Sequence, residues 1–204
     1  MKYKNIVFDM GNVLLTYNSD NAAKQYTDDE KIIREIRNII FASAEWELLD
    51  GGLITEEKAM EKWLPRFEND KQREIAKKSF ATWDKVCMQT DERMGDIVRE
   101  LKAKGKNVYV LSNASLRLPK MYKEVIPAAD EFDGIFFSAT EKLLKPQKEI
   151  YERFFEKFNL KPEECVFIDD LQDNIDGAAL AGMDGYCFKD RDVSKLRKFL
   201  ELEG

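Results

Sequence analysis

Histidine is absent from the 204 residues of the chain. Without it the protein has no Ser–His–Asp triad, no Cys–His pair and no zinc site built on histidine. Nucleophilic attack and proton transfer must therefore use carboxylate, lysine, serine, tyrosine or cysteine side chains. This restriction narrows the possible classes of enzyme before any motif is considered.

Cysteine is scarce, with only Cys87, Cys165 and Cys187, and no two of them form a CxxC pair. Cys165 and Cys187 lie in apolar runs, so we expect them to be small buried residues. An odd number of widely spaced cysteines favours a reducing, cytoplasmic compartment over a disulfide framework.

Long apolar runs and basic clusters are missing as well. The N-terminus shows no signal-peptide pattern, and no stretch approaches the roughly twenty apolar residues of a membrane span. The net charge is −6, with 35% charged residues of both signs and 44% hydrophobic residues. This balance predicts a soluble globular protein without nucleic-acid or membrane partners, and no pattern indicates an oligomeric state.

Short apolar runs bounded by Gly, Asp or Asn predict five buried strands. They are Ile6–Phe8, Val108–Leu111, Ile135–Ser138, Cys165–Ile168 and Tyr186–Phe188. Between these strands, apolar residues recur at helical spacing and form three stripes. The stripes are Met94, Ile97, Val98 and Leu101; Ile150, Phe154 and Phe158; and Ile175, Ala178 and Ala179. This alternation predicts an α/β fold with a doubly wound, Rossmann-like parallel sheet.

Residues 16–90 show helical apolar spacing and no convincing strand. Thr55, followed by two glutamates, is typical of a helix N-cap. We therefore expect a helical domain at 16–90, inserted into a core built from 1–15 and 91–204. Its tryptophans are expected to form its own core, and two residues near its start are candidates to face a substrate. The tryptophans are Trp46, Trp63 and Trp83, and the candidates are Tyr17 and Asn18.

Polar side chains stand where the predicted strands end, which is where open parallel sheets bind ligands. They are Asp9, Ser112, Asn113, Lys145, Asp169 and Asp170. Three converging carboxylates repel one another unless a cation lies among them, and Mg²⁺ prefers such oxygen ligands. Ser112, Asn113 and Lys145 can hold the oxygens of a phosphate, and the carboxylate of Asp9 can attack its phosphorus.

Four motifs that contain these residues resemble those of the haloacid dehalogenase superfamily, in the same order and over nearly the whole chain. They are FDMGNVL with Asp9, VLSNAS with Ser112, LLKPQKEIYE with Lys145, and FIDDLQDNIDGAALAGM with Asp169 and Asp170. The resemblance implies a nucleophilic Asp9, a phosphate-binding Ser112, a charge-neutralising Lys145 and an acidic metal site. It also implies that the helical insert is a type-one cap, because DGGLITEE at 50–57 is similar to a cap segment of phosphatase members.

The resemblance implies a Mg²⁺-dependent phosphatase acting on a small phosphate ester through an aspartyl-phosphate intermediate. Mg²⁺ would be bound by Asp9, Asp170 and the Gly11 carbonyl, with Asp169 as a further ligand or as a residue that orients Lys145. Asp173 and Asn174 are weaker candidates for the acidic metal site, because they could instead cap the helix that follows. Ser112 and Asn113 could likewise cap the helix that follows them. Sugar phosphates are favoured because the start DxGNV is similar to that of α-glucose-1-phosphate phosphatase.

Gly11 departs from the family pattern, which usually has a second aspartate at this position to protonate the leaving group. Two alternatives therefore remain open. One is a 2-haloacid dehalogenase, which needs no such proton, although the Asp169–Asp170 pair and the late first arginine, Arg34, do not match that branch. The other is a non-catalytic relative that binds a phosphate ligand.

Overall fold

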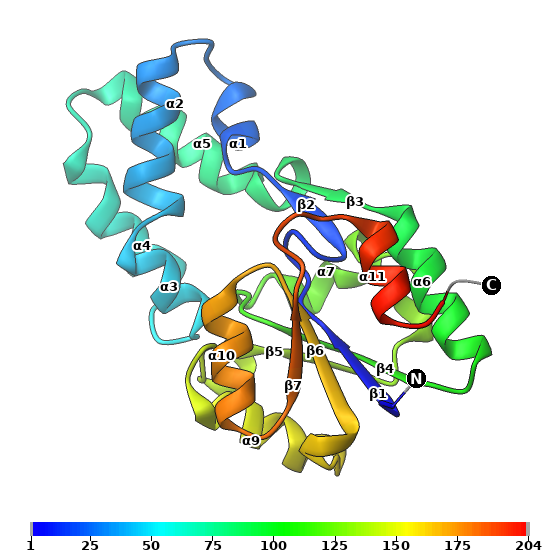
Figure 1. Cartoon of the computed structure of the whole chain (residues 1–204). Helices are drawn as coiled ribbons and strands as arrows, with labels where there is room; N and C mark the ends of the chain where they lie inside the picture. The colour runs from blue at the N-terminus through cyan, green and yellow to red at the C-terminus, as the bar shows by residue number, and fades with distance from the viewer. Residues whose placement is uncertain (1, 203–204) are drawn as a thin grey trace.

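The computed structural model describes residues 2–202, and its core is a parallel sheet with the strand order β5-β4-β1-β6-β7 (Figure 1). Every neighbouring pair in this sheet is parallel, and Asn5 of the central strand pairs with Asn107 and Cys165. The predicted α/β sheet and its five strands are confirmed. The strands are β1 (Asn5–Phe8), β4 (Asn107–Ser112), β5 (Gly134–Phe137), β6 (Cys165–Asp169) and β7 (Asp184–Cys187).

Helices cover both faces of the sheet, as the doubly wound prediction requires. Successive side chains of a strand point to opposite faces. Accordingly, Ile6 and Phe8 pack in one cluster of buried residues with α6 and α11, whereas Val7 packs in another with α9 and α10. The core helices are α6 (Glu92–Ala103), α7 (Leu118–Val125), α8 (Ser138–Glu141), α9 (Lys148–Phe158), α10 (Gln172–Leu180) and α11 (Val193–Phe199), with short 3-10 turns η3 (Ala129–Glu131) and η4 (Pro162–Glu164).

A second group of helices lies away from the sheet, beyond the carboxyl ends of its strands (Figure 1). Thr55 accepts a hydrogen bond from the Lys58 backbone N–H at 3.3 Å, which confirms it as an N-cap. Trp63 is fully buried within this group. Its elements are α1 (Asp20–Lys24), α2 (Glu30–Ile36), the π-helical turn η1 (Arg37–Phe41), α3 (Ala44–Asp50), α4 (Glu56–Trp63), η2 (Leu64–Arg66) and α5 (Asp70–Val86).

Two short strands connect this group to the sheet, so the prediction that residues 16–90 contain no strand is wrong. β2 (Leu15–Tyr17) and β3 (Met88–Thr90) pair antiparallel, with Leu15 opposite Thr90. Each has only three residues, too few for a visible alternation. Their partners lie far apart in sequence, so the pairing forms only when the chain closes on itself.

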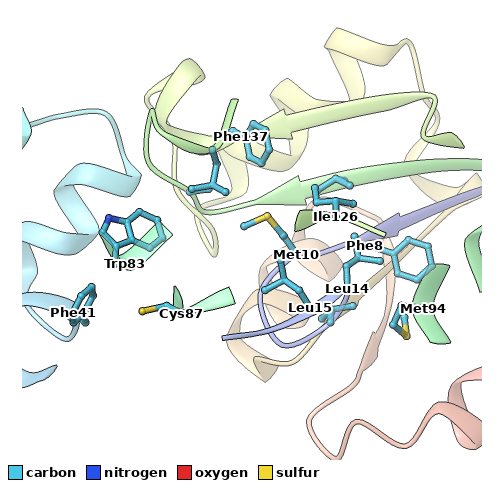
Figure 2. Packing of buried hydrophobic residues seen from close by; sticks show 14 of the residues in the cluster. Phe8, Met10, Leu14, Leu15, Phe41, Trp83, Cys87, Met94, Ile126 and Phe137 are labelled. Carbon is cyan, nitrogen blue, oxygen red and sulfur yellow. The ribbon is translucent and has the colours of Figure 1, made fainter. Parts of the chain in front are cut away.

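One cluster of buried apolar residues continues from the sheet into the outer helices. Met10, in the loop after β1, belongs to the same cluster as Trp83 of α5 and Cys87, and Figure 2 shows these members of the cluster. The sheet domain and the outer helices are therefore packed against each other through buried side chains, and the covalent connections are not their only link. Among the described residues, no helix combines the length and apolar character needed to cross a membrane.

Candidate active site

A cavity of about 520 Å³ lies between the carboxyl end of the sheet and the outer helices. Its polar floor contains the residues that the sequence placed at strand ends, with the exception of Asp169. They are Asp9, Ser112, Asn113, Lys145 and Asp170, and Gly11 lines the cavity beside them. The carboxyl ends of β1, β4 and β6 thus bring together residues more than a hundred positions apart in the chain.

Asp9 and Lys145 form the centre of this floor. The Lys145 ammonium lies 2.9 Å from Oδ1 of Asp9 and 2.7 Å from Oδ2 of Asp169. Asp9 is 8% exposed and Lys145 is 5% exposed. Burial raises the pKa of Asp9 to about 6, and the Lys145 charge opposes this rise. Burial alone would lower the pKa of Lys145, but the two carboxylates outweigh it and raise that pKa, which keeps the ammonium charged.

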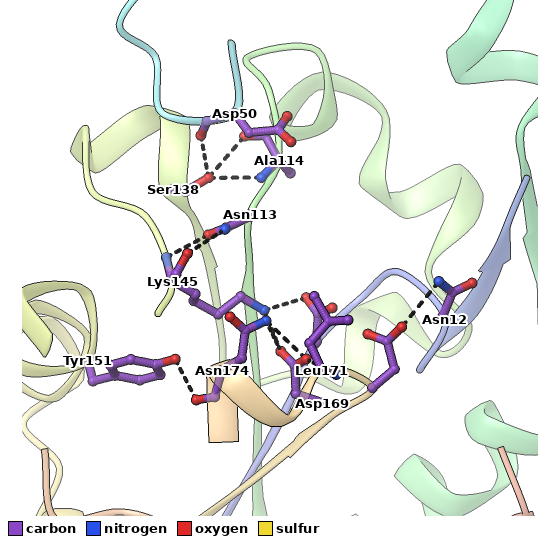
Figure 3. A network of polar contacts seen from close by, with 12 residues as sticks. Asn12, Asp50, Asn113, Ala114, Ser138, Lys145, Tyr151, Asp169, Leu171 and Asn174 are labelled. Carbon is purple, nitrogen blue, oxygen red and sulfur yellow. Dashed lines mark hydrogen bonds and ion pairs between the residues drawn. The ribbon is translucent and has the colours of Figure 1, made fainter. Parts of the chain in front are cut away.

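Asp169 lies beneath the floor and is fully buried. Its Oδ1 accepts hydrogen bonds from the Leu171 backbone N–H at 2.8 Å and from the Asn174 amide at 3.0 Å. Its Oδ2 accepts from Lys145 at 2.7 Å and again from Asn174 at 3.0 Å (Figure 3). Both oxygens are therefore occupied by protein donors, an arrangement that fits a residue orienting Lys145 better than a metal ligand.

The Asn113 side chain holds the backbone of Lys145. Its amide donates to the Lys145 carbonyl at 3.1 Å, and its oxygen accepts from the Lys145 N–H at 3.0 Å. Gly177 of α10 lets this loop approach closely, since a Cβ there would lie 2.3 Å from the Pro146 carbonyl oxygen. The Asn113 amide thus fixes the position of Lys145, whereas the buried Ser112, at the end of β4, carries no such bond in the described residues.

The capping alternatives for four residues are wrong. The helix after β4 begins at Leu118 with Arg117 as N-cap, so neither Ser112 nor Asn113 caps it. Asp173 and Asn174 lie inside the first turn of α10, whose N-cap is Leu171 without a side-chain bond. Because α7 begins only at Leu118 and α10 already at Gln172, none of the four residues occupies an N-cap position.

The carboxylates of Asp9, Asp169 and Asp170 offer oxygens within 4.8 Å of one another. Lys145 is the single cation in contact with this group among the described residues, so negative charge remains uncompensated. Burial and the neighbouring Asp169 raise the pKa of Asp170. This charge and donor set fits a hard divalent cation such as Mg²⁺. Asp9, Asp170 and Gly11 face the cavity, whereas Asp169 is already saturated.

Asn12 is a site residue whose role the sequence did not reveal. Its backbone is left-handed with φ 54°, a conformation that asparagine tolerates better than most residues. Its amide donates to Asp170 Oδ2 at 3.3 Å, and its oxygen accepts from the Tyr17 backbone N–H at 3.2 Å. Asn12 therefore connects the carboxylate cluster to β2. The sequence signal that could have revealed this role is the position of Asn12 directly after Asp9-Met10-Gly11 at the end of a predicted strand.

The outer helices and β2 supply an aromatic wall opposite the floor. Tyr17, Trp46 and Trp83 line the cavity, whereas Trp63 and Asn18 do not. Trp46 and Trp83 also pack edge to face, with ring centroids 5.0 Å apart, so they serve as core and wall at once. The Tyr17 hydroxyl and the Trp83 indole N–H are buried and have no hydrogen-bond partner among residues 2–202, which leaves them available to a ligand.

Comparison with known proteins identifies the class. The family model for haloacid dehalogenase-like hydrolases matches residues 3–182, and the chain belongs to this family. The chain is 32% identical over 190 residues to the sesquiterpene phosphatase astK of Aspergillus oryzae, a match that covers 90% of this chain and 88% of that protein.

Solved structures confirm the fold. A family enzyme from Bacteroides thetaiotaomicron, in complex with magnesium and inorganic phosphate, aligns with a TM-score of 0.62 at 24% identity over 90% of this chain and 93% of its own. The L-2-haloacid dehalogenase of Xanthobacter autotrophicus aligns with the same TM-score, 0.62, at 17% identity over 90% of this chain and 76% of its own. Because the two scores are equal, likeness in fold does not favour one of these two proteins over the other as a model for the chemistry of this chain.

Proposed function

We propose that the protein is a Mg²⁺-dependent phosphatase that hydrolyses a small phosphomonoester through an aspartyl-phosphate intermediate. The observation that carries this proposal is the buried Asp9 carboxylate at the end of the central strand, paired with Lys145 and open to the cavity. In this proposal residues 1–15 and 91–204 form the catalytic core, and residues 16–90 form a cap that encloses the substrate.

The chain's own residues have distinct roles in the proposed reaction. Asp9 attacks phosphorus, and the Lys145 ammonium and the Ser112 hydroxyl bind the phosphoryl oxygens. Asn113 and Asp169 hold Lys145 in place through the bonds described above. Mg²⁺, held by Asp9, Asp170 and the Gly11 carbonyl, would supply positive charge that offsets the negative charge of the transferring group.

The site favours a phosphatase over a dehalogenase. The acidic pair Asp169–Asp170 is retained next to Asp9, and the carboxylates of Asp9 and Asp170 fit a divalent cation, whereas Asp169 orients Lys145. No arginine lines the cavity among residues 2–202. Arg34, the first arginine in the chain, is exposed on α2. A halide and a carboxylate would therefore find no guanidinium here. The retained nucleophile, lysine and acidic cluster likewise favour catalysis over phosphate binding alone.

The wall of the cavity bears on the substrate class. A sugar phosphate was favoured by the motif DxGNV, and it remains a candidate. The aromatic and apolar side chains Trp46, Trp83, Met88 and Leu118 favour an organic group with apolar faces. The similar protein from Aspergillus oryzae is a sesquiterpene phosphatase, so a prenyl phosphate is a second candidate.

A panel of phosphate esters that contains sugar, nucleoside and prenyl phosphates tests the proposal. With Mg²⁺ we expect release of inorganic phosphate from at least one ester, abolished by chelator and lowered by at least about 10³-fold in Asp9→Asn. Asp28→Asn, an exposed carboxylate in the cap, is the matched control and should retain wild-type rates. Wild-type release that does not exceed Asp9→Asn would refute the proposal. Fluoride release from fluoroacetate that is insensitive to chelator would instead favour the dehalogenase.

A further inference from the structure

The cavity contains a carboxylate that the four motifs do not include. Asp50 ends α3 and lines the same cavity as Asp9 and Gly11. A Cβ added at Gly11 would meet no atom within 4 Å, so the space that an acidic side chain would fill there is open. A phosphate ester bound to Asp9 would therefore meet no acidic side chain from position 11, whereas Asp50 lines the cavity from the side of the outer helices.

Asp50 is held rigidly against the core. The Ser138 hydroxyl donates to the Asp50 carbonyl and accepts from the Ala114 backbone N–H at 2.8 Å (Figure 3). Gly52, with φ 63°, packs so closely that a Cβ would lie 2.3 Å from the Ala139 carbonyl oxygen. The turn that carries Asp50 is thus fixed over the loop that follows Ser112, next to the proposed phosphate position.

The surroundings of Asp50 suit proton transfer near neutral pH. Burial is the main cause that raises its pKa to about 7. Asp9 and Glu47 raise it further, whereas the Ser115 backbone N–H and the Trp46 indole lower it. Tyr17 of β2 lines the same cavity, and its pKa is raised mainly by burial and further by the charges of Cys87 and Asp50. A pKa of about 7 makes both protonation states of Asp50 accessible at neutral pH.

We infer that Asp50 is the general acid and base of the reaction, supplied by the cap in place of the side chain that Gly11 lacks. This inference rests on the proposed function. As Asp9 attacks and the bond from phosphorus to the ester oxygen breaks, Asp50 gives its proton to that oxygen, and the alcohol leaves. Its carboxylate then takes a proton from the attacking water as the bond from phosphorus to Asp9 breaks, which restores both residues and releases inorganic phosphate.

Two esters of different leaving groups test the inference in the Mg²⁺-loaded protein. p-Nitrophenolate leaves without a proton, whereas an alkoxide needs one. We expect Asp50→Asn to lower kcat/KM for hexyl phosphate by about 10²-fold or more and that for p-nitrophenyl phosphate by less than about tenfold. For hexyl phosphate, wild-type kcat/KM should fall as pH rises through about 7, and this decline should be absent from the variant.

Controls separate the possible failures. Glu61→Gln removes an exposed cap carboxylate outside the cavity and should match wild type on both esters. Thermal unfolding and a Mg²⁺ titration establish that Asp50→Asn folds and binds the cation, and Asp50→Glu should recover part of the hexyl phosphate rate. Wild-type inactivity on every ester would refute the proposed function. An active wild type with equal losses on both esters, or none, would overturn the role of Asp50 alone.

Discussion

Lys145 illustrates how single residues in this protein depend on one another. Its ammonium is buried between Asp9 and Asp169, and the charges are compatible with burial only as a group. Its position after a strand end made it predictable from the motif. The residues that hold it were only partly predictable. Asn113 was expected to bind phosphate, and Asn174 was one of several candidates, because their partners depend on how distant loops meet.

Replacing Lys145 by methionine should destabilise the protein, because two buried carboxylates lose their partner. We expect the free energy of unfolding, measured by urea denaturation in chelator, to fall by about 3 to 5 kcal/mol. The control Lys148→Met removes an exposed lysine paired with Glu152 and should cost less than about 1 kcal/mol. Similar losses in the two variants would contradict the buried network.

The turn after α3 shows what an element contributes beyond its own sequence. The segment at 50–57 resembles a cap segment of phosphatase members, but its contact with the sheet domain was not predictable, since it depends on Ser138 and Ala139 in α8. By contrast, the five strands of the sheet follow from short β-branched runs, and α6, α9 and α10 follow from apolar spacing. Local sequence patterns therefore predict the helices and strands, whereas the contacts between these elements can be seen only in the folded structure.

Gly52→Ala should loosen this turn, because the added Cβ would meet the Ala139 carbonyl oxygen at 2.3 Å. We expect a loss of more than about 2 kcal/mol in the free energy of unfolding, together with a lower phosphatase rate as Asp50 shifts. Gly105→Ala is the matched control. Its φ of 72° is also left-handed, but no atom lies within 4 Å of its Cβ, so only about 1 kcal/mol is expected. Equal losses would indicate that backbone strain alone accounts for the effect.

At the scale of the whole molecule, Arg117 joins the sheet domain to the outer helices, which the proposed function assigns as a cap. It precedes α7 in the core and donates to both oxygens of Glu56 in α4, at 2.6 and 2.7 Å. Its guanidinium also lies 3.4 Å from Asp84 and 4.7 Å from the centre of the Phe80 ring, both in α5. A planar cation that bonds one helix and stacks on another restricts movement of the cap over the cavity.

Arg117→Met should therefore release the cap without unfolding the core. We expect faster hydrogen exchange in α4 and α5, unchanged exchange in β1 and β6, and a lower kcat/KM for the substrate. Arg153→Met serves as the control, since Arg153 pairs on the surface with Glu141 and Glu156, both of which belong to the sheet domain. Unchanged exchange in α4 and α5 would show that the apolar cluster alone holds the cap.

The sequence by itself determined the α/β sheet, the helical insert and the strand-end residues Asp9, Ser112, Lys145 and Asp170. These features follow from local periodicity and from the rule that parallel strands end at one edge. Only the tertiary structure decided that Asp169 is saturated, that Asn113 holds Lys145, and that Asp50 lines the same cavity as Asp9. Each of these depends on contacts between segments far apart in the chain, whose approach is set by packing rather than by any local pattern.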